Sequence, residues 1–292
     1  MTLRAFHLTG VILVGSIVFM SSNFALAQPS SASTPSIGML PDAPGLDSAA
    51  AEGSSPANMD DSSSTTGAGS HSGLVGRSVR RGLEDQKNLY LAPLKPSNFK
   101  WDLLMLAGTG ALLAADRTIE SNLSKAHFNV YQNTSDVLIG GLGASLAGVW
   151  IYGIKTDNQH ARETGVLELE TLTNTFLIYT PMQLIAGRQR PGEGNGNGDF
   201  LQHHALNTSF PAGHAMFAWS MAAVAAHEYP KPWVQVLVYG TAAGITASRF
   251  LAHDHWASDS LVGTGLGFAI GTYIFHSRCD PALSPSCHRQ KK

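Results

Sequence analysis

Charged residues and cysteines are scarce in this sequence. Asp, Glu, Lys and Arg together make up 14% of its 292 residues, against about a quarter in typical soluble proteins. The 19 basic residues do not outnumber the 21 acidic ones, so the formal net charge is −2 and the chain lacks the positive field of a nucleic-acid-binding domain. Its 2 cysteines exclude a small fold held by several disulfides. Hydrophobic residues are plentiful, at 43%, which excludes a chain that is disordered throughout.

The first 27 residues have the pattern of a secretory signal peptide. Arg4 supplies the positive start, and residues 8–20 form an apolar stretch that is short for a membrane span. The tripeptide Ala-Leu-Ala at 25–27 is a typical cleavage site. We therefore expect export, with the mature protein periplasmic or associated with a membrane and its site on the outer side. The alternative is an uncleaved N-terminal anchor.

The segment from 28 to 76 is rich in Ser, Ala, Gly and Pro and contains no Lys or Arg. It cannot bury enough apolar surface to offset the entropy that ordering would cost, so a disordered tether is expected there. In an exported chain, Cys279 and Cys287 are predicted to form a disulfide across a short loop. Two free thiols are the alternative.

Residues 77–292 are predicted to form one all-α domain, a bundle of about six core helices. Apolar runs of helix length alternate with polar breaks marked by Gly or Pro, and no segment alternates with a period of two. The predicted helices cover residues 101–115, 135–154, 165–186, 212–228, 232–248 and 256–276.

The same helices leave the relation to a membrane open. The second and the last are long and apolar enough to cross one, whereas Glu168 and Glu170 in the third would be costly in lipid. An embedded bundle and a water-soluble bundle therefore both remain. Close helix packing is expected in either case at Gly140, Gly141, Gly143, Gly263, Gly265, Gly267 and Gly271.

Three short segments carry the residues that chemistry would need. The first, GRQRP at 187–191, ends the third predicted helix, where arginines suit the dipole and proline stops the helix. The second, SFPAGH at 209–214, opens the fourth helix, and its Pro and Gly bring backbone N–H groups to a helix N-terminus, a favourable place for an anion. His214 lies in the first turn there. Each of these segments alone also has a purely structural interpretation.

The third segment, SRFLAHDHWASD at 248–259, combines a cation with an imidazole and a carboxylate. His255 and Asp259 are four residues apart and so would share one face of a helix. A carboxylate in that place accepts the Nδ1 proton of the imidazole and leaves Nε2 free to attack. Arg249 precedes both across an expected turn and would bind an anion. A structural His–Asp pair is the alternative for this segment alone.

In order and spacing, the three segments resemble the type 2 phosphatidic acid phosphatase (PAP2) family, which shares its fold with the vanadium haloperoxidases. The signatures of that family are K-x6-R-P, P-S-G-H and S-R-x5-H-x3-D. This chain matches the third in full, the second at Pro211, Gly213 and His214, and the first in its R-P pair. The resemblance covers about residues 100–276 and implies a PAP2-like helical fold.

The resemblance also implies a metal-independent phosphatase that hydrolyses phosphate monoesters through a phosphohistidine. His255 would attack phosphorus, Asp259 would orient it, and His214 would protonate the leaving oxygen. No metal and no other cofactor is implied, because arginines take the place of a cation. The phosphate-binding positions implied are Arg190, Gly213, Arg249 and Gln183.

Two positions depart from the family pattern. Gln183 stands where the family has its lysine and Ala212 where it has its serine, and both family side chains contact phosphate. Gln183 carries no charge, and charge-assisted hydrogen bonds are about twice as strong as neutral ones. We therefore expect a weakened but active acid or lipid phosphatase; Arg188 could replace the missing charge only if the helix end bends. The alternative is a catalytically impaired envelope protein of the same fold that binds phosphate headgroups.

A phosphorylated lipid or a small organic phosphate is the expected substrate, with a membrane as the expected partner and no nucleic acid. A metal site is the rival interpretation of the histidine-rich segments. Its candidate ligands would be His203, His204, His214, His253, Asp254 and His255. Their spacing is not a common ligand pattern, and a metal would leave Arg190 and Arg249 unexplained, so phosphate binding is preferred.

Overall fold

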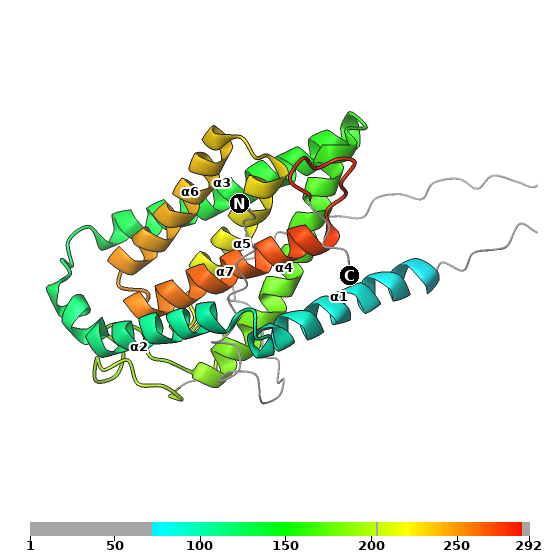
Figure 1. The fold of residues 1–292 in the computed structure, drawn as a ribbon. Helices are drawn as coiled ribbons and strands as arrows, with labels where there is room; N and C mark the ends of the chain where they lie inside the picture. Colours follow the sequence, from blue (N-terminus) through cyan, green and yellow to red (C-terminus); the bar gives the residue numbers. More distant parts are fainter. Residues whose placement is uncertain (1–71, 203, 288–292) are drawn as a thin grey trace, which may run out of the picture. The chain divides into compact units, whose positions relative to one another are not determined.

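The computed structural model describes residues 72–202 and 204–287, with the backbone alone for 72–79. This part of the chain has seven α-helices, one short 3-10 helix and no strand (Figure 1), which confirms the all-α prediction. The elements are α1 (Ser72–Leu91), η2 (Ala92–Leu94), α2 (Phe99–Asn122), α3 (Phe128–Lys155), α4 (Gln159–Ala186), α5 (Gly213–Glu228), α6 (Pro232–Leu251) and α7 (Ala257–Arg278). The expected signal peptide at 1–27 and residues 28–71 of the expected tether lie outside the described residues.

The predicted helices do not include α1, although apolar residues in its sequence recur at helical spacing, as at Val75, Val79 and Leu83. This helix begins at Ser72, inside the end of the segment expected as a tether. A few contacts with the rest of the chain hold it: Leu89 is buried, and the Asp85 carboxylate accepts from Nη2 of Arg278 at 2.8 Å. Because Arg278 ends α7, far along the chain, this support is long-range.

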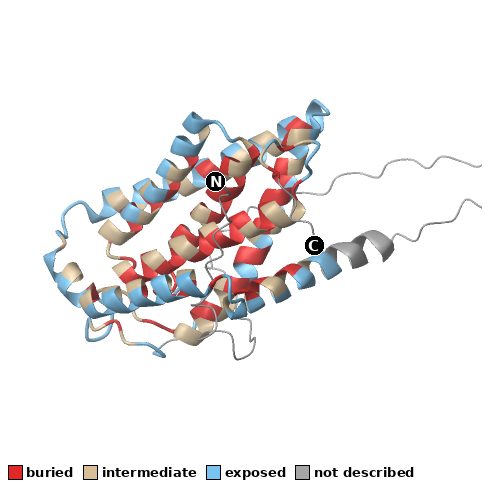
Figure 2. Cartoon of the chain, in the orientation of Figure 1, coloured by how far each residue is buried: buried red, intermediate tan, exposed pale blue. Residues whose placement is uncertain are grey.

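The helices α5 and α7 pair closely, and buried residues gather along both (Figure 2). Glycines of α7 lie directly against the backbone of α5. A Cβ at Gly267 would stand 2.2 Å from the Met216 carbonyl oxygen, and one at Gly263 would stand 2.4 Å from that of Ala212. Only a residue without Cβ permits so close an approach. This seam places the start of α5 beside the start of α7, and with them the second and third sequence motifs.

The outer helices expose much apolar surface. Large exposed side chains include Leu103, Leu104 and Leu106 of α2, Val137 and Ile151 of α3, Leu169 and Phe176 of α4, and Val236 and Leu237 of α6. Among the described helices, α3 has the length and apolar composition that crossing a membrane would require. The same expectation for the last helix is wrong, because Gly, Ser and Thr dilute the apolar residues of α7. The expected close packing at Gly140, Gly141 and Gly143 of α3 is also wrong, since a Cβ there would meet open space.

The connection between α4 and α5 carries the first two motifs. Helix α4 ends because Gly187 adopts a left-handed conformation (φ 49°), with its N–H donating to the Gln183 carbonyl oxygen at 3.1 Å. The chain then returns to the bundle, where the Ser209 N–H donates to the Arg188 carbonyl oxygen at 2.8 Å. That backbone bond joins the first motif to the second.

A disulfide between Cys279 and Cys287 closes the loop that follows α7, with a Cα–Cα distance of 5.8 Å. Inside this loop, the Ser284 hydroxyl donates to Oε2 of the buried Glu228 at 2.6 Å. The same carboxylate oxygen lies 2.7 Å from Nε2 of His160. The loop thus supplies one of two partners to Oε2 of a buried carboxylate, at the end of α5 opposite to the motifs.

Candidate active site

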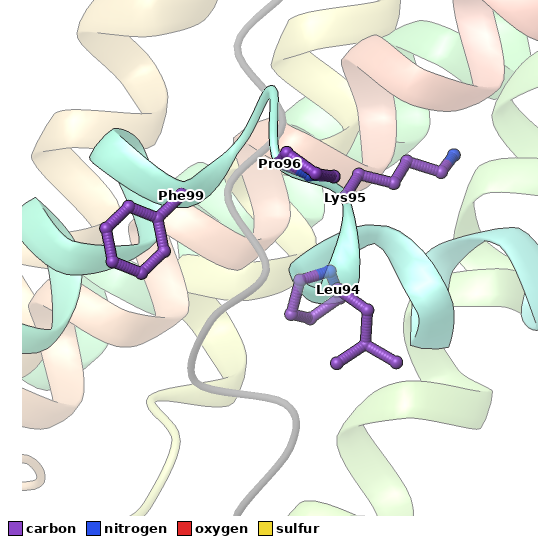
Figure 3. Close-up of a pocket in the computed structure, with 5 residues that line it drawn as sticks. Leu94, Lys95, Pro96 and Phe99 are labelled. Carbon is purple, nitrogen blue, oxygen red and sulfur yellow. The ribbon is translucent and has the colours of Figure 1, made fainter.

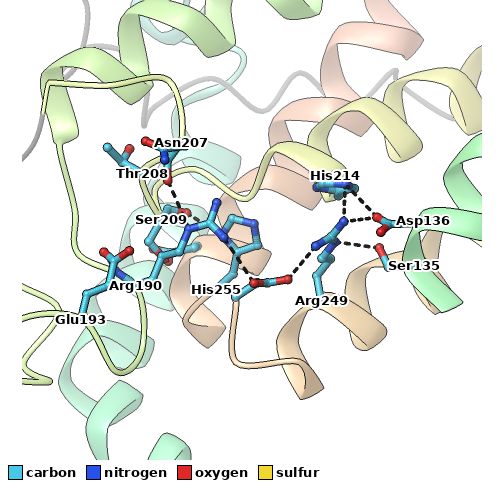
Figure 4. Close-up of polar contacts among 12 residues, drawn as sticks. Ser135, Asp136, Arg190, Glu193, Asn207, Thr208, Ser209, His214, Arg249 and His255 are labelled. Atoms are coloured by element: carbon cyan, nitrogen blue, oxygen red, sulfur yellow. Dashed lines mark hydrogen bonds and ion pairs between the residues drawn. The ribbon is translucent and has the colours of Figure 1, made fainter. Parts of the chain in front are cut away.

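Arg190 and Arg249, which come from separate motifs, meet through one carboxylate (Figure 4). Oδ1 of Asp254 accepts from Nη1 of Arg190 at 3.2 Å, and its Oδ2 accepts from Nη1 of Arg249 at 2.7 Å. Arg190 also donates through Nε to the Asn207 carbonyl oxygen at 3.2 Å. The two guanidinium groups form what we call the arginine cradle.

His214 lies beside Arg249, in the first turn of α5. Its Nε2 is 2.7 Å from Nη2 of Arg249, so it accepts that hydrogen bond as a neutral imidazole. The same Nη2 binds Asp136 of α3, and Nε of Arg249 donates to the Ser135 hydroxyl at 2.9 Å. Burial and the Arg249 charge lower the pKa of His214 to about 4, against the opposing effect of Asp136. His214 is therefore unprotonated at neutral pH in the ligand-free protein.

His255 follows Asp254 directly and is 3% exposed. Its Nδ1 lies 2.7 Å from the Ser209 carbonyl oxygen. A carbonyl oxygen only accepts hydrogen bonds, so Nδ1 carries the proton and Nε2 keeps its lone pair. Burial, followed by the Arg190 charge, lowers the pKa of His255 to about 3. The site thus presents a neutral nitrogen nucleophile beside the arginine cradle.

Asp259 does not hold His255 in the way that the sequence predicts. Its Oδ2 accepts from the Ser209 hydroxyl at 2.5 Å, and its Oδ1 accepts from Nη1 of Arg188 at 2.5 Å. The Asp259 carboxylate therefore acts on His255 indirectly: it binds the hydroxyl of Ser209, and the carbonyl oxygen of Ser209 binds the imidazole. The i, i+4 argument fails because α7 begins only at Ala257, so His255 precedes the helix and does not share its face.

Arg188 is buried and is not part of the arginine cradle. Its Nη2 donates to Asp116 of α2 at 2.8 Å, and its Nη1 to Asp259. The rings of Phe200 and Trp256 lie 4.8 Å and 5.1 Å from its guanidinium carbon. Two carboxylates already bind this guanidinium group, so Arg188 does not replace the missing lysine. We call Arg188, Asp116 and Asp259 the buried network.

Gln183 holds the chain around the second motif. Its side chain is fully buried, and its amide nitrogen donates to the Pro211 carbonyl oxygen at 3.0 Å. Its amide oxygen accepts from the Thr208 N–H at 2.8 Å and from the Thr208 hydroxyl at 2.6 Å. The expectation that Gln183 binds phosphate does not agree with these contacts. A lysine could not make the last two bonds, because an ammonium group has no acceptor.

Gly213 begins α5, where a side chain has no room. A Cβ there would stand 2.8 Å from the ring of Tyr179. The first N–H groups of a helix have no acceptor within it. Because His214, in the same turn, contacts Arg249, this helix start lies at the arginine cradle, where its N–H groups favour an anion. Ala212, directly before it, is 1% exposed.

The candidate metal ligands do not gather in one place. Nδ1 of His253 lies 2.5 Å from Oε1 of Glu120, and Nδ1 of His204 lies 3.0 Å from the Leu184 carbonyl oxygen. Within residues 72–202 and 204–287, no three His, Cys, Asp or Glu side chains are grouped so as to hold a metal ion. His203 lies outside the described residues. The histidine-rich segments therefore serve separate purposes.

Three residues of the site lie outside the sequence motifs: Ser135 and Asp136 of α3 and Asp116 of α2. Asp116 is a buried carboxylate that follows the apolar run of α2. A buried polar group costs free energy unless it is hydrogen-bonded, so this residue carries a signal that could have found it. Ser135 and Asp136 follow other polar residues near the start of α3 and carry no such signal. The arginine partners could not be read from the sequence, because the contacts join α2 to the loop after α4, and α3 to α6, across more than 70 positions.

A surface pocket lies elsewhere, at the joint of η2 and α2 (Figure 3). Its lining residues are Pro93, Leu94, Lys95, Pro96 and Phe99. They offer a single charged group and no acid–base pair, and none belongs to the three motifs. The pocket is therefore not the candidate active site.

Residues 166–280 match the model of the PAP2 superfamily. Over 65 residues the chain is 37% identical to the lipid A 1-phosphatase of Porphyromonas gingivalis; this stretch is 22% of the present chain and only 15% of that protein. A crystal structure of the first transmembrane PAP2 type phosphatidylglycerolphosphate phosphatase from Bacillus subtilis aligns with a TM-score of 0.43 at 20% identity, covering 59% of this chain and 92% of that one. The range that matches the PAP2 superfamily contains all three motifs and the groups that meet at the arginine cradle.

Proposed function

We propose that this chain is an exported, metal-independent phosphatase that hydrolyses phosphate monoesters of lipids at a membrane. The observation that carries the proposal is the neutral His255, with a free Nε2, beside Arg190 and next to Asp254 of the arginine cradle. A phosphoryl group there would find guanidinium donors and helix N–H groups for its oxygens. Two arginines supply the positive charge that other phosphatases take from a metal ion.

In the first proposed step, Nε2 of His255 attacks phosphorus, and the bond from phosphorus to the ester oxygen breaks. The phosphoryl group becomes bonded to Nε2, while the Ser209 carbonyl oxygen keeps its bond to Nδ1–H and stabilises the positive ring. His214 gives a proton to the leaving oxygen. The negative substrate beside His214 raises the pKa of that imidazole in the complex, which supplies the proton it needs.

In the second step, His214 takes a proton from a water molecule. The water oxygen attacks phosphorus, the bond from phosphorus to Nε2 breaks, and inorganic phosphate leaves with His255 restored. The two histidines therefore have different roles: one forms the covalent intermediate, and the other moves a proton in each step.

A lipid phosphate is the proposed substrate class. The outward faces of α2, α3, α4 and α6 expose many large apolar side chains, as a surface in contact with lipid would. The relative matched over 65 residues is named as a phosphatase of lipid A. The expected signal peptide at 1–27 and tether at 28–76 add a route to the envelope. N-terminal sequencing of the exported protein tests that part, with Gln28 expected as the first residue.

Phosphate release from purified protein tests the proposed activity. The assay compares phosphatidic acid with p-nitrophenyl phosphate, with and without a chelator. We expect chelator-resistant release that His255→Ala abolishes. His204→Ala is the matched control, since it removes a histidine that contacts the Leu184 carbonyl oxygen instead of the arginine cradle. Release that stops on adding the chelator, or that survives in His255→Ala, contradicts the proposal.

A second candidate is an envelope protein that binds phosphate headgroups without hydrolysing them. It is favoured by Gln183, whose amide is used up in holding Thr208 and Pro211 where the family has a phosphate-binding lysine. The same assay separates the two candidates. Binding of inorganic phosphate or vanadate, with no release from either ester, would select the binding protein.

A further inference from the structure

Asp254 is a buried carboxylate inside the proposed phosphate site. It lies in the turn between α6 and α7, where its N–H donates to the Arg249 carbonyl oxygen at 3.1 Å, and it is 6% exposed. Each of its carboxylate oxygens accepts from one guanidinium group, that of Arg190 or that of Arg249. Two oxygens of a phosphoryl group would bind the two arginines in the same manner. The ligand-free cradle therefore already contains an anion that belongs to the chain (Figure 4).

Counting donors shows how far the cradle is filled. At Arg249 every guanidinium nitrogen has a partner: Nε donates to Ser135, Nη1 to Asp254, and Nη2 to Asp136 and His214. At Arg190, Nε donates to Asn207 and Nη1 to Asp254, and Nη2 has no acceptor within the described residues. A guanidinium group has five N–H donors. A phosphoryl group therefore finds three unused donors at Arg190, but at Arg249 four of the five donors are used and a single N–H of Nη1 remains.

The charges lead to the same conclusion. Two arginines face two carboxylates, those of Asp254 and Asp136, and His214 accepts a hydrogen bond in its neutral form. The cradle is thus close to neutral before a ligand arrives. A free phosphate ion gains little electrostatic energy from entering a neutral site, because each attraction to a guanidinium group is offset by repulsion from a carboxylate.

We propose that Asp254 is a specificity-determining residue that competes with phosphate for the two arginines. Inorganic phosphate then binds weakly and leaves readily after hydrolysis. A substrate must supply further binding energy from its alcohol part, which favours an ester with a large apolar group. This inference rests on the proposed phosphate site, but it concerns the affinity of that site and not turnover.

Calorimetric titration with inorganic phosphate, and separately with vanadate, tests the inference. Asp254→Asn keeps the shape and one acceptor oxygen and removes the charge. We expect it to bind both anions at least about tenfold more tightly than the unchanged protein, since hydrogen bonds to charged groups are the strong ones. The matched control is Glu193→Gln, because Oε2 of Glu193 accepts from the backbone N–H of Arg190 at 2.8 Å, away from the guanidinium group. It removes an equal charge nearby, and its affinity should change by less than about threefold, as for exposed charges in water.

The outcomes distinguish an Asp254 that competes with phosphate from an Asp254 that only supports the two arginines. If Asp254 only orients the arginines, Asp254→Asn binds phosphate as weakly as the unchanged protein or more weakly, and the inference is overturned. Equal tightening in Glu193→Gln overturns it as well, since the effect would then come from overall charge. Asp254→Ala is a second variant, in case Asp254→Asn misfolds. In Asp254→Ala, acetate should replace the missing carboxylate and so compete with phosphate. Absence of that competition counts against the inference. A protein that binds phosphate as expected but releases none from esters contradicts the proposed function alone.

Discussion

The buried network and the arginine cradle both depend on guanidinium–carboxylate pairs, but they differ in exposure to solvent and in whether N–H donors remain unused. In the buried network, the side chains of Arg188, Asp116 and Asp259 are between 0% and 3% exposed, and the one guanidinium group is bound by two carboxylates inside the protein. In the cradle, the side chain of Arg190 is 30% exposed and keeps unused donors. Similar guanidinium–carboxylate pairs therefore serve two purposes. The buried network, a closed set, holds the backbone that orients His255. The arginine cradle, a partly open set, receives an anion.

The difference follows from the connections between the two sets. Asp259 of the closed set binds the Ser209 hydroxyl, and the Ser209 carbonyl oxygen binds Nδ1 of His255. Asp254 of the open set is the residue before His255. The nucleophile is therefore oriented from one side by a network that ligands do not reach, and it faces the other set, which they do.

The largest effect on stability is expected for Arg188→Met. It leaves Asp116 and Asp259 buried without their cation, which costs about 3–5 kcal/mol when one partner of a buried pair is removed. Arg190→Met, its counterpart in the cradle, should lower the free energy of unfolding by less, because Asp254 keeps its bond to Arg249 and Arg190 itself is partly exposed. Urea denaturation followed by circular dichroism measures both. Equal losses in the two variants would erase the distinction between the two sets.

A smaller loss is expected for Gln183→Lys, although it restores the family residue. Lysine offers no acceptor to the N–H and hydroxyl of Thr208, and each buried group left unsatisfied costs about 1–3 kcal/mol. We expect roughly 2–4 kcal/mol of lost stability in the same denaturation experiment. Gln202→Lys, at an exposed position in the same connection, is the control and should be near neutral. A stable, more active Gln183→Lys would mean that this position reaches phosphate after all.

Gly267→Ala tests the seam that brings the two motif-bearing helices together. The added Cβ would stand 2.2 Å from the Met216 carbonyl oxygen, so α5 and α7 must move apart, at a cost of about 1–3 kcal/mol. Gly143→Ala is the control, because open space surrounds that position within α3 and alanine suits a helix better than glycine by about 1 kcal/mol. The first variant should lower the melting temperature and the second should not. A tolerated Gly267→Ala would argue against the close approach of α5 and α7.

The mildest prediction concerns pH. His214 must be protonated and His255 neutral for the first step, and their pKa values are about 4 and about 3. For the free enzyme, kcat/KM on phosphatidic acid, whose leaving oxygen needs a proton, should therefore fall about tenfold per pH unit above about pH 4. Two histidines of ordinary pKa would instead place this fall near pH 6.5. His214→Ala should remove the slope, and a fall that begins near pH 6.5 in the unchanged protein would contradict the lowered pKa of His214.

Stability should respond to pH in the opposite direction. Both histidines have a folded pKa below the ordinary value of 6.5, so the unfolded chain binds more protons between about pH 3 and 6.5. The stabilisation that depends on their neutral forms is complete above pH 6.5 and is lost as pH falls through that window. Thermal melting at a series of pH values measures this loss, and a melting temperature constant from pH 7 to 4 would contradict it.

Some features of the fold and site could be predicted from the local sequence pattern, and others depend on contacts between distant parts of the chain. The helices from α2 to α7 could be predicted because each has an apolar run of sufficient length and a break that ends it, such as Gly187 after α4. The residues of the arginine cradle could be predicted because a family resemblance joins motifs that are distant in the chain. Helix α1 was not predicted, because the composition of 28–76 favoured a tether, although the apolar residues of this helix also have helical spacing.

The contacts within the site were harder to predict than its members. The spacing of His255 and Asp259 suggested a direct bond, but the helix start at Ala257 moves the imidazole off the helix. The change from lysine to Gln183 suggested a weakened phosphate contact, whereas the side chain has a different set of partners. Asp136 belongs to no motif, and only the packing of α3 against α6 brings it to Arg249.

The covalent intermediate on His255 tests the central claim most directly. In His214→Ala, p-nitrophenyl phosphate should still transfer its phosphoryl group, because p-nitrophenolate leaves without a proton, but no base then activates water. We predict that a phosphoryl group accumulates on the peptide that contains His255 and is stable to alkali, as mass spectrometry after an alkaline quench would show. An unmodified His255 peptide, or a phosphoryl group on any other residue, would contradict the account.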